Sequence, residues 1–313
     1  MHDATQELTR PGPIVGGPAS TTALAGHAER RFAARSRMAA LGRDLRGSRG
    51  VVIGGTLFLV LTAIAIFAPV IAPFDPIEQD YGQTLRPPSR EHLMGTDNFG
   101  RDIFSRVIYG GRVSLMIGVS VTVAAALLGS ILGLLSGYFP RLDTPIMRTL
   151  DGLMAFPSIL LAIAIMASLG PSATNVFLAL TVVYTPTIAR LVRSTTLVTR
   201  QQPYVESARS IGMTDSGILL RYVYPNGLSP LIVQCTFVVA FAIISEASLS
   251  FLGAGVDPET PTWGNMLRDG QRVLQVAWWL ALFPGIALVL TVLTLNLLGD
   301  ALRDALDPRG RAR

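Results

Sequence analysis

Few side chains in this sequence have the types and spacing that catalysis or metal binding requires. All 26 basic residues are arginine, and a chain without lysine cannot form a Walker A loop, whose lysine reaches the phosphates of a nucleotide. His2, His27 and His92 are scattered without ligand spacing. The single cysteine, Cys235, falls in an apolar run and offers neither a disulfide nor a thiolate site. We therefore expect no catalytic residue, metal or cofactor in this chain.

One carboxylate stands inside a long apolar run and could have a chemical role. Glu246 is the one ionisable residue that we place within a membrane span, and Ser245, Ser248 and Ser250 lie beside it. An intramembrane carboxylate is costly unless it faces a wet cavity or the interior of a helix bundle. Two interpretations stay open. Either Ser245 and Glu246 line a solute pathway, or Glu246 is a structural carboxylate near a helix end, hydrogen-bonded to a neighbouring helix.

A second feature is the polar stretch YVESARSIGMTDSGILLRYVYPN, which separates two apolar runs in the second half of the chain. Pro203 suits a first helical turn, and Gly212 suits a helix stop. Thr214 or Asp215 can then cap a second helix, which Pro225 ends. The pattern predicts two short helices joined by a glycine turn.

Both predicted helices are amphipathic. The first has an apolar face made of Tyr204, Val205, Ala208 and Ile211, opposite Glu206, Arg209 and Ser210. The second carries Ile218, Leu219, Tyr222 and Val223. An exposed apolar stripe on such a hairpin indicates a protein partner.

Composition places these features in a membrane protein. The chain has 313 residues, of which 50% are hydrophobic and 15% charged, and its mean hydropathy is +0.47, whereas soluble domains carry roughly 25% charged residues. A bilayer core requires about 20 apolar helical residues. The apolar runs predict an all-α membrane protein with six spans, at Val51–Ala72, Val113–Phe139, Leu153–Leu169, Ala173–Ala189, Leu228–Ala254 and Val276–Leu298. We divide the chain into an N-terminal tail (1–50), expected to be flexible, a membrane domain (51–299) with a long loop (190–227), and a C-terminal tail (300–313).

Arginine counts predict the orientation. Both tails and the loops after spans 2 and 4 hold 19 arginines, whereas the three other loops hold 7. Because cytoplasmic loops are enriched in arginine and lysine, both termini and the loop 190–227 are predicted to be cytoplasmic.

Other motifs favour packing over chemistry. Gly129, Gly133 and Gly137 form a doubled GxxxG that lets another helix approach closely. The turn residues around Gly95 precede an apolar stripe, 103–108, which predicts an interfacial helix. Trp278 and Trp279 suit an aromatic belt at the membrane interface, and Trp263 suits either contact with a binding protein or closure of the pathway.

Taken together, the hairpin residues carry a family resemblance. The resemblance is to the EAA motif of ABC importer permeases. The matching residues are Glu206, Ser207 and Ala208, followed after three residues by Gly212 and, after nine more residues and a tripeptide, by Pro225. This chain departs from the pattern Glu-Ala-Ala, Gly, Ile-x-Leu-Pro at three places, Ser207, Tyr222 and Tyr224. In that family the motif forms a coupling helix that docks into the ATPase subunit. The resemblance assigns ATPase coupling to Glu206, Ser207, Ala208, Gly212, Met213 and Pro225.

Further segments resemble the C-type permeases of the dipeptide, oligopeptide and nickel group. These segments are HLMGTDNFGRDIFSRVIYGGRVSL, LDGLMAFPSILLAIAI, SEASLSFLGAGV, PTWGNML and NLLGDALRDALDP. The resemblance extends over almost all of the chain from about Ser48 onward.

The resemblance implies a type I ABC importer permease fold in a bacterial cytoplasmic membrane. It also implies partners: a second, homologous permease subunit in a heterodimer, two ATP-binding subunits or domains that bind ATP and magnesium, and an extracytoplasmic solute-binding protein. No nucleic acid is expected. Short peptides are the leading solutes, and nickel chelates or glutathione are the alternatives. A self-contained secondary transporter is the alternative class of function. Such carriers usually show several membrane-embedded carboxylates or internal repeats, and in a carrier of this kind the hairpin would have no role.

Overall fold

The computed structural model describes residues 49–306, which lie in one compact unit. These residues are mostly helical, and the β pairing among them is a single isolated bridge between Thr96 and Asp102. The predicted N-terminal tail lies outside the described residues except at its end, and so do positions 307–313 of the predicted C-terminal tail.

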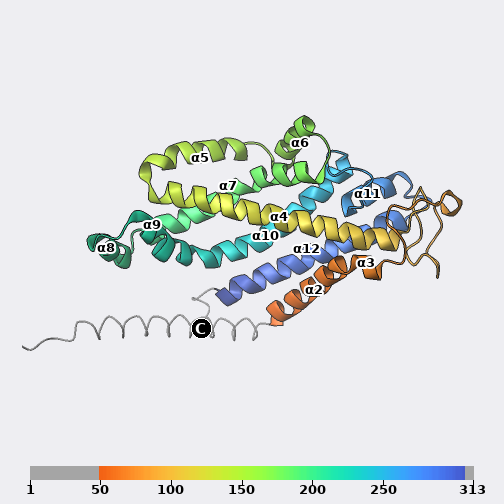
Figure 1. Ribbon diagram of the computed structural model, residues 1–313, viewed down its shortest axis with the longest axis horizontal. Coiled ribbons are helices and arrows are strands. Elements are labelled where there is room, and N and C mark those ends of the chain that lie inside the picture. Colours follow the sequence, from red (N-terminus) through yellow and green to blue (C-terminus); the bar gives the residue numbers. More distant parts are fainter. Residues whose placement is uncertain (1–48, 307–313) are drawn as a thin grey trace, which may run out of the picture. The chain divides into compact units, whose positions relative to one another are not determined.

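Four long helices lie side by side and form the body of this unit (Figure 1). They are α4 (Ile103–Tyr138), α7 (Ala173–Thr199), α10 (Tyr224–Leu252) and α12 (Trp279–Leu306). Within the described range these helices are long and apolar enough to cross a bilayer, α10 being counted with the turns that lead into it. The predicted all-helical membrane architecture is confirmed, and α12 continues seven residues into the predicted C-terminal tail.

Close contact between α4 and α7 depends on small residues. A Cβ atom at Gly133 would lie 2.6 Å from the carbonyl oxygen of Ala189, and Cβ atoms at Gly129 and Gly137 would lie 2.8 and 2.7 Å from side-chain atoms of α7. A larger residue at any of these positions would push the helices apart. The packing role predicted for the doubled GxxxG is confirmed.

The first predicted span is two helices rather than one. α2 (Arg49–Ile66) packs against α12, and α3 (Ala68–Ile71) follows after a break at Phe67. Pro69 explains the break, because proline lacks the N–H that would continue the helical ladder and is tolerated in the first turn of a new helix.

The third predicted span is also interrupted. α5 (Pro140–Met154) and α6 (Ser158–Leu169) meet at 90°. Pro157 is extended, with φ −53° and ψ 131°, and disfavours helical geometry in the residue before it. The span predicted at Leu153–Leu169 is therefore not one continuous helix, and α6 alone, at about 18 Å, is too short to span a bilayer.

The predicted interfacial helix at 103–108 is wrong as well, because those residues are the first turns of α4. Asp102 caps this helix, with a carboxylate oxygen that accepts a hydrogen bond from the Ser105 N–H at 2.8 Å. Ile103 and Val107 are buried against α11 (Trp263–Arg272) and α12. The apolar stripe therefore faces protein, not lipid.

The fourth span continues past its predicted end at Ala189, so the following loop is shorter than expected. Arg190 and Arg193 lie on α7 and bind carboxylates of α5: Arg193 holds Asp143 through two hydrogen bonds of 2.6 and 2.7 Å, and Arg190 donates to Asp151 at 2.7 Å. The helix ends at Thr199, ten residues past the predicted end of the span, and both arginines on this extension are paired.

Two of the three tryptophans lie inside the protein. Trp279 is buried and its indole N–H donates to the carbonyl oxygen of Thr96 at 3.2 Å, whereas Trp278 is half exposed. Of the two residues predicted for an aromatic belt, only Trp278 is exposed, and its place in such a belt stays a prediction. Trp263 is buried too, with its N–H 3.0 Å from the carbonyl oxygen of Val107, so neither surface role predicted for it fits this structure.

Candidate functional site

The stretch with the EAA-like pattern forms a hairpin at one end of the long helices, which we call the α8 end (Figure 1). The hairpin, residues 203–218, consists of α8 (Pro203–Ser210), a turn and α9 (Asp215–Ile218). Pro203 lies in the first turn of α8, as predicted.

α8 ends at a turn in which Gly212 adopts a left-handed backbone conformation. Its φ is +79°, and its N–H donates to the carbonyl oxygen of Arg209 at 3.0 Å, while the next N–H, of Met213, donates to that of Ala208 at 3.1 Å. This pair of bonds is a Schellman motif. A side chain at Gly212 would meet no atom within 4 Å, so the backbone conformation alone calls for glycine there.

The second half of the hairpin differs from the sequence-based expectation. Thr214 caps α9 by accepting from the Gly217 N–H at 3.3 Å, as predicted. Pro225 was expected to end the second helix, but α9 continues through a π-helical turn, η2 (Leu219–Val223), directly into α10. Pro225 lies in the first turn of α10, where a missing N–H is tolerated, and the wider π turn before it accommodates the misfit.

The apolar face of α8 is divided between the protein interior and the surface. Val205 and Ala208 are buried, whereas Tyr204 is 41% and Ile211 79% exposed. Glu206 and Ser207 are exposed on the same short helix. The hairpin therefore presents one large apolar side chain, a tyrosine and a carboxylate to its surroundings.

Glu246 lies far from the hairpin, inside the junction of α4, α10 and α11. Its side chain is 0% exposed. Ser114 of α4 donates to one carboxylate oxygen at 2.8 Å, and Ser250, one turn along α10, donates to the other at 2.9 Å. Both oxygens thus have a partner within the chain. The geometry fits the structural interpretation of this carboxylate, and a role in a pathway remains a prediction.

Ser245, the neighbouring residue, has a different environment. Its hydroxyl lies 2.7 Å from the hydroxyl of Tyr184 on α7, which also donates to the carbonyl oxygen of Phe241 at 3.1 Å. Ser245 and Tyr184 are both partly exposed. The structure therefore separates two residues that the sequence suggested as one site: Glu246 points into the bundle, and Ser245 lies at its margin.

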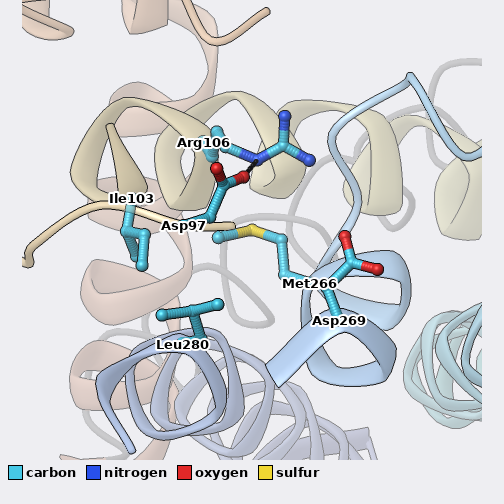
Figure 2. Close-up of a pocket in the computed structure, with 6 residues that line it drawn as sticks. All are labelled: Asp97, Ile103, Arg106, Met266, Asp269 and Leu280. Atoms are coloured by element: carbon cyan, nitrogen blue, oxygen red, sulfur yellow. Dashed lines mark ion pairs between the residues drawn. The ribbon is translucent and has the colours of Figure 1, made fainter. Parts of the chain in front are cut away.

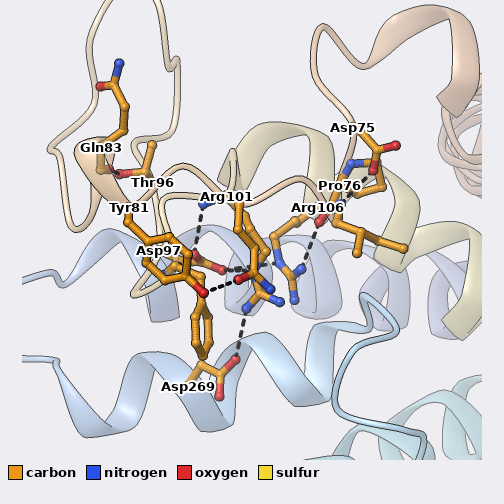
Figure 3. Close-up of polar contacts among 12 residues, drawn as sticks. Asp75, Pro76, Tyr81, Gln83, Thr96, Asp97, Arg101, Arg106 and Asp269 are labelled. Atoms are coloured by element: carbon orange, nitrogen blue, oxygen red, sulfur yellow. Dashed lines mark hydrogen bonds and ion pairs between the residues drawn. The ribbon is translucent and has the colours of Figure 1, made fainter.

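At the opposite end of the long helices, the α11 end, sequence reasoning missed a buried network of charges (Figure 3). Arg101 donates to Asp97 at 2.6 Å and approaches Asp269 of α11 at 3.8 Å. Arg106 lies 3.6 Å from the same Asp97 carboxylate and donates to the carbonyl oxygen of Pro76 at 2.9 Å. A signal was present in the sequence, since Arg101 precedes the apolar stripe 103–108 and Arg106 lies within it.

The network borders a small cavity lined by Asp97, Ile103, Arg106, Met266, Asp269 and Leu280 (Figure 2). Its free volume of about 10 Å³ is room for roughly one water molecule. Arg106 is 1% exposed, and burial raises the pKa of Asp269 although the two nearby arginines lower it. The site joins the loop before α4 to α11 and has no space for a solute. Nor do the described residues contain a group of three or more potential metal ligands.

Comparison with known proteins gives matches over most of the chain. Residues 125–312 match the family described as binding-protein-dependent transport system inner membrane component, and residues 36–88 match the N-terminal transmembrane domain of oligopeptide transport permease C. A Brucella suis protein named as a peptide transport system permease protein is 48% identical over 85% of this chain and 90% of its own length. The glutathione transport system permease protein of Escherichia coli (strain 536) is 47% identical over 85% of this chain and 89% of its own length.

Among solved structures, the inward-facing MetNI methionine ABC transporter has a chain of similar fold. The TM-score is 0.54 at 18% sequence identity, and the match covers 64% of this chain and 96% of the other. At this identity the likeness concerns the fold alone.

Proposed function

The chain belongs to the family of binding-protein-dependent transport system inner membrane components, in its peptide-permease group, and from that premise we propose that it is the translocation subunit of an ATP-driven importer of short peptides. The observation that carries this proposal is the hairpin, a helix, Schellman turn and helix in the register of the EAA pattern, with Tyr204, Glu206 and Ile211 exposed. The family assignment argues against a self-contained secondary transporter.

The ATPase partners follow from the chemistry that this chain lacks. Without a lysine it has no Walker A loop, so two partner subunits or domains would bind ATP and magnesium. We infer that the hairpin docks on one of them through Glu206, Ser207, Gly212 and Met213. Ala208 would contribute to coupling from behind this surface, since it is buried against the ring of Tyr138, and Pro225 lies in the first turn of α10. A second, homologous permease subunit would complete the pore as a heterodimer, and an extracytoplasmic binding protein would deliver the solute.

The proposed orientation puts the hairpin and both termini in the bacterial cytoplasm. Support comes from the arginine distribution, to which Arg190 and Arg193 near the α8 end contribute. A cysteine at Thr260, in a Cys235→Ser background, should react with an impermeant maleimide on cells stripped of any outer barrier, and one at Thr214 should not. The reverse labelling would contradict the coupling role.

The proposed mechanism is alternating access, in which closure of the ATPases moves the hairpin and opens the pore outward to accept the solute. Ser245 is proposed to line the pathway, and Glu246 is proposed to join it only when α10 moves, because its carboxylate is enclosed by Ser114 and Ser250 in the described state. In the described state Ser245 is the accessible one of the two.

Short peptides are the proposed solute class, supported by the oligopeptide permease match and by the peptide-transport relative. Glutathione is the alternative, favoured by the relative of nearly equal identity that is named for it. Nickel chelates have no comparable support among these relatives.

The test is uptake by the complete transporter in proteoliposomes, with the binding protein present and labelled dialanine, glutathione or a nickel–histidine chelate as the solute. We expect ATP-dependent accumulation of dialanine. Accumulation of glutathione alone would establish the alternative. Uptake by this chain without ATPase subunits, driven by an ion gradient, would refute the importer assignment.

A further inference from the structure

We propose that Tyr138, the last residue of α4, is a positioning residue that transmits movement of the hairpin to α4 through its hydroxyl group. The inference rests on the proposed function, because it concerns how a docked ATPase would move the membrane helices. It adds Tyr138, Arg209 and Asp215 to the residues that the EAA-like pattern marks.

The hydroxyl of Tyr138 joins both halves of the hairpin. It donates to a carboxylate oxygen of Asp215, at the start of α9, at 2.6 Å. It accepts from the guanidinium of Arg209, near the end of α8, at 3.3 Å. The Arg209 guanidinium also lies 5.8 Å from the centre of the Tyr138 ring, within the range of a cation–π contact.

These bonds have no counterpart elsewhere on the hairpin. Among residues 49–306, the two bonds to Tyr138 are the only side-chain hydrogen bonds that connect residues 203–218 with a helix outside the hairpin, and no ion pair does so. The remaining side-chain bonds of the hairpin, such as those of Ser207 and Ser210, go to its own backbone. One hydroxyl group thus carries the polar attachment of the hairpin.

Apolar contacts hold the hairpin as well, but they do not fix its position in the same way. The ring of Tyr138 is buried with Val205, Ala208, Ile218 and Val223. Apolar burial is non-directional, so these contacts permit small slides of α8 across the ring. Hydrogen bonds depend steeply on distance and angle, and two of them from one hydroxyl fix the register of α8 and α9 against α4.

The end of α4 is itself anchored, so that a force applied there acts on the membrane helices. Arg200 donates to the carbonyl oxygen of Gly137 at 2.9 Å, and Gly137 lies against Thr196 of α7. From Tyr138, α4 continues without a break to its cap at Asp102. Movement of the hairpin would therefore reach α4 and α7 together.

The decisive variant is Tyr138→Phe, which keeps the ring and its apolar contacts and removes the hydroxyl. In the complete transporter reconstituted in proteoliposomes, we measure ATP hydrolysis with and without the binding protein and dialanine. A net hydrogen bond contributes about 1 kcal/mol, so we expect stimulated hydrolysis to fall about fivefold. Basal hydrolysis and co-purification of the ATPase subunits should not change.

Further variants distinguish transmission from a general loss of structure. Asp215→Ala should reproduce the defect, the double variant should be no worse than either single one, and Asp215→Asn, which keeps an acceptor, should restore stimulation to within about twofold. The matched control is Tyr222→Phe, because Tyr222 borders the same cluster and its hydroxyl makes no hydrogen bond within the described residues.

Fully stimulated ATP hydrolysis in Tyr138→Phe would overturn the proposal. A loss of ATPase co-purification in both Tyr138→Phe and Asp215→Ala would also overturn it, because the hydroxyl group would then be needed for assembly and not for transmission. A wild-type chain that neither co-purifies with ATPase subunits nor shows stimulation would refute the proposed function itself, which is a distinguishable result.

Discussion

The two ends of the helix bundle are built in opposite ways. At the α11 end, buried charges, capped helix starts and two buried tryptophans connect α4 and the loop before it to α11 and α12. At the α8 end, the hairpin has large exposed side chains, and within residues 49–306 its side-chain hydrogen bonds to other helices all go to one hydroxyl group. The difference fits the proposal that the α11 end sets the architecture, whereas the α8 end receives a partner and moves.

The strongest test of this comparison is the buried arginine of the α11 end. Arg106→Leu leaves Asp97 and Asp269 with one cation fewer in a buried site, and breaking a buried pair typically costs about 3 to 5 kcal/mol. We expect a large loss of thermal stability of the detergent-purified subunit. Arg90→Leu, at an exposed position without an ion pair in the described range, is the control and should leave the melting temperature unchanged.

A smaller effect is expected at Glu246. Glu246→Ala removes the acceptor for Ser114 and Ser250, and unsatisfied buried hydroxyls should lower stability by about 1 to 3 kcal/mol. Glu246→Gln keeps one acceptor and should be milder. Transport of dialanine and of its amino-acetylated form, where the binding protein accepts both, decides between the two interpretations. A selective loss for the free amine indicates a pathway residue, and an unchanged ratio indicates helix packing.

At the α8 end, Gly212→Ala should have a smaller effect on stability than on function. Alanine at a φ of +79° costs roughly 1 to 2 kcal/mol, and the strain stays within the hairpin. We expect normal membrane insertion with reduced ATP hydrolysis in response to the loaded binding protein. Gly152→Ala is the matched control, since that glycine is helical and a Cβ there meets no atom within 4 Å. Equal defects in both variants would argue against a special turn.

The smallest effect on stability is expected from Ile211→Ser. Its side chain is 79% exposed, and surface substitutions usually change stability by less than about 0.5 kcal/mol. If a partner covers Ile211, co-purification of the ATPase subunits should nevertheless weaken. Leu220→Ser, also exposed but outside the hairpin, is the control. Unchanged binding in both would remove the apolar side chain from the proposed docking surface.

Much of the fold could be predicted from the sequence because bilayer thickness sets the length of apolar runs. The runs around α4, α7, α10 and α12 were found in this way. Several failures occurred at prolines, where one residue type has several outcomes. Pro157 bends a predicted span by 90°, whereas Pro225, expected to end a helix, lies inside a continuous one. Which outcome occurs depends on how the elements around the proline pack, and this packing cannot be read from the sequence.

The candidate site shows the same division. The local pattern of proline, glycine and threonine was enough to predict α8, its stop at Gly212 and the cap at Thr214, because turns and caps depend on a few adjacent residues. The charged network at the α11 end could not be predicted, since Asp97 and Asp269 are 172 positions apart and their meeting depends on how three elements pack.

The sequence by itself determined the membrane class, the absence of a Walker A lysine and the helix, turn and helix of the hairpin, all of which follow from composition or from residues close in the chain. Only the tertiary structure decided that Glu246 is enclosed by two serines, that the apolar face of α8 is half buried, and that Tyr138 reaches Arg209 and Asp215. The physical reason is that burial and side-chain hydrogen bonds depend on distances between helices, which no local pattern specifies.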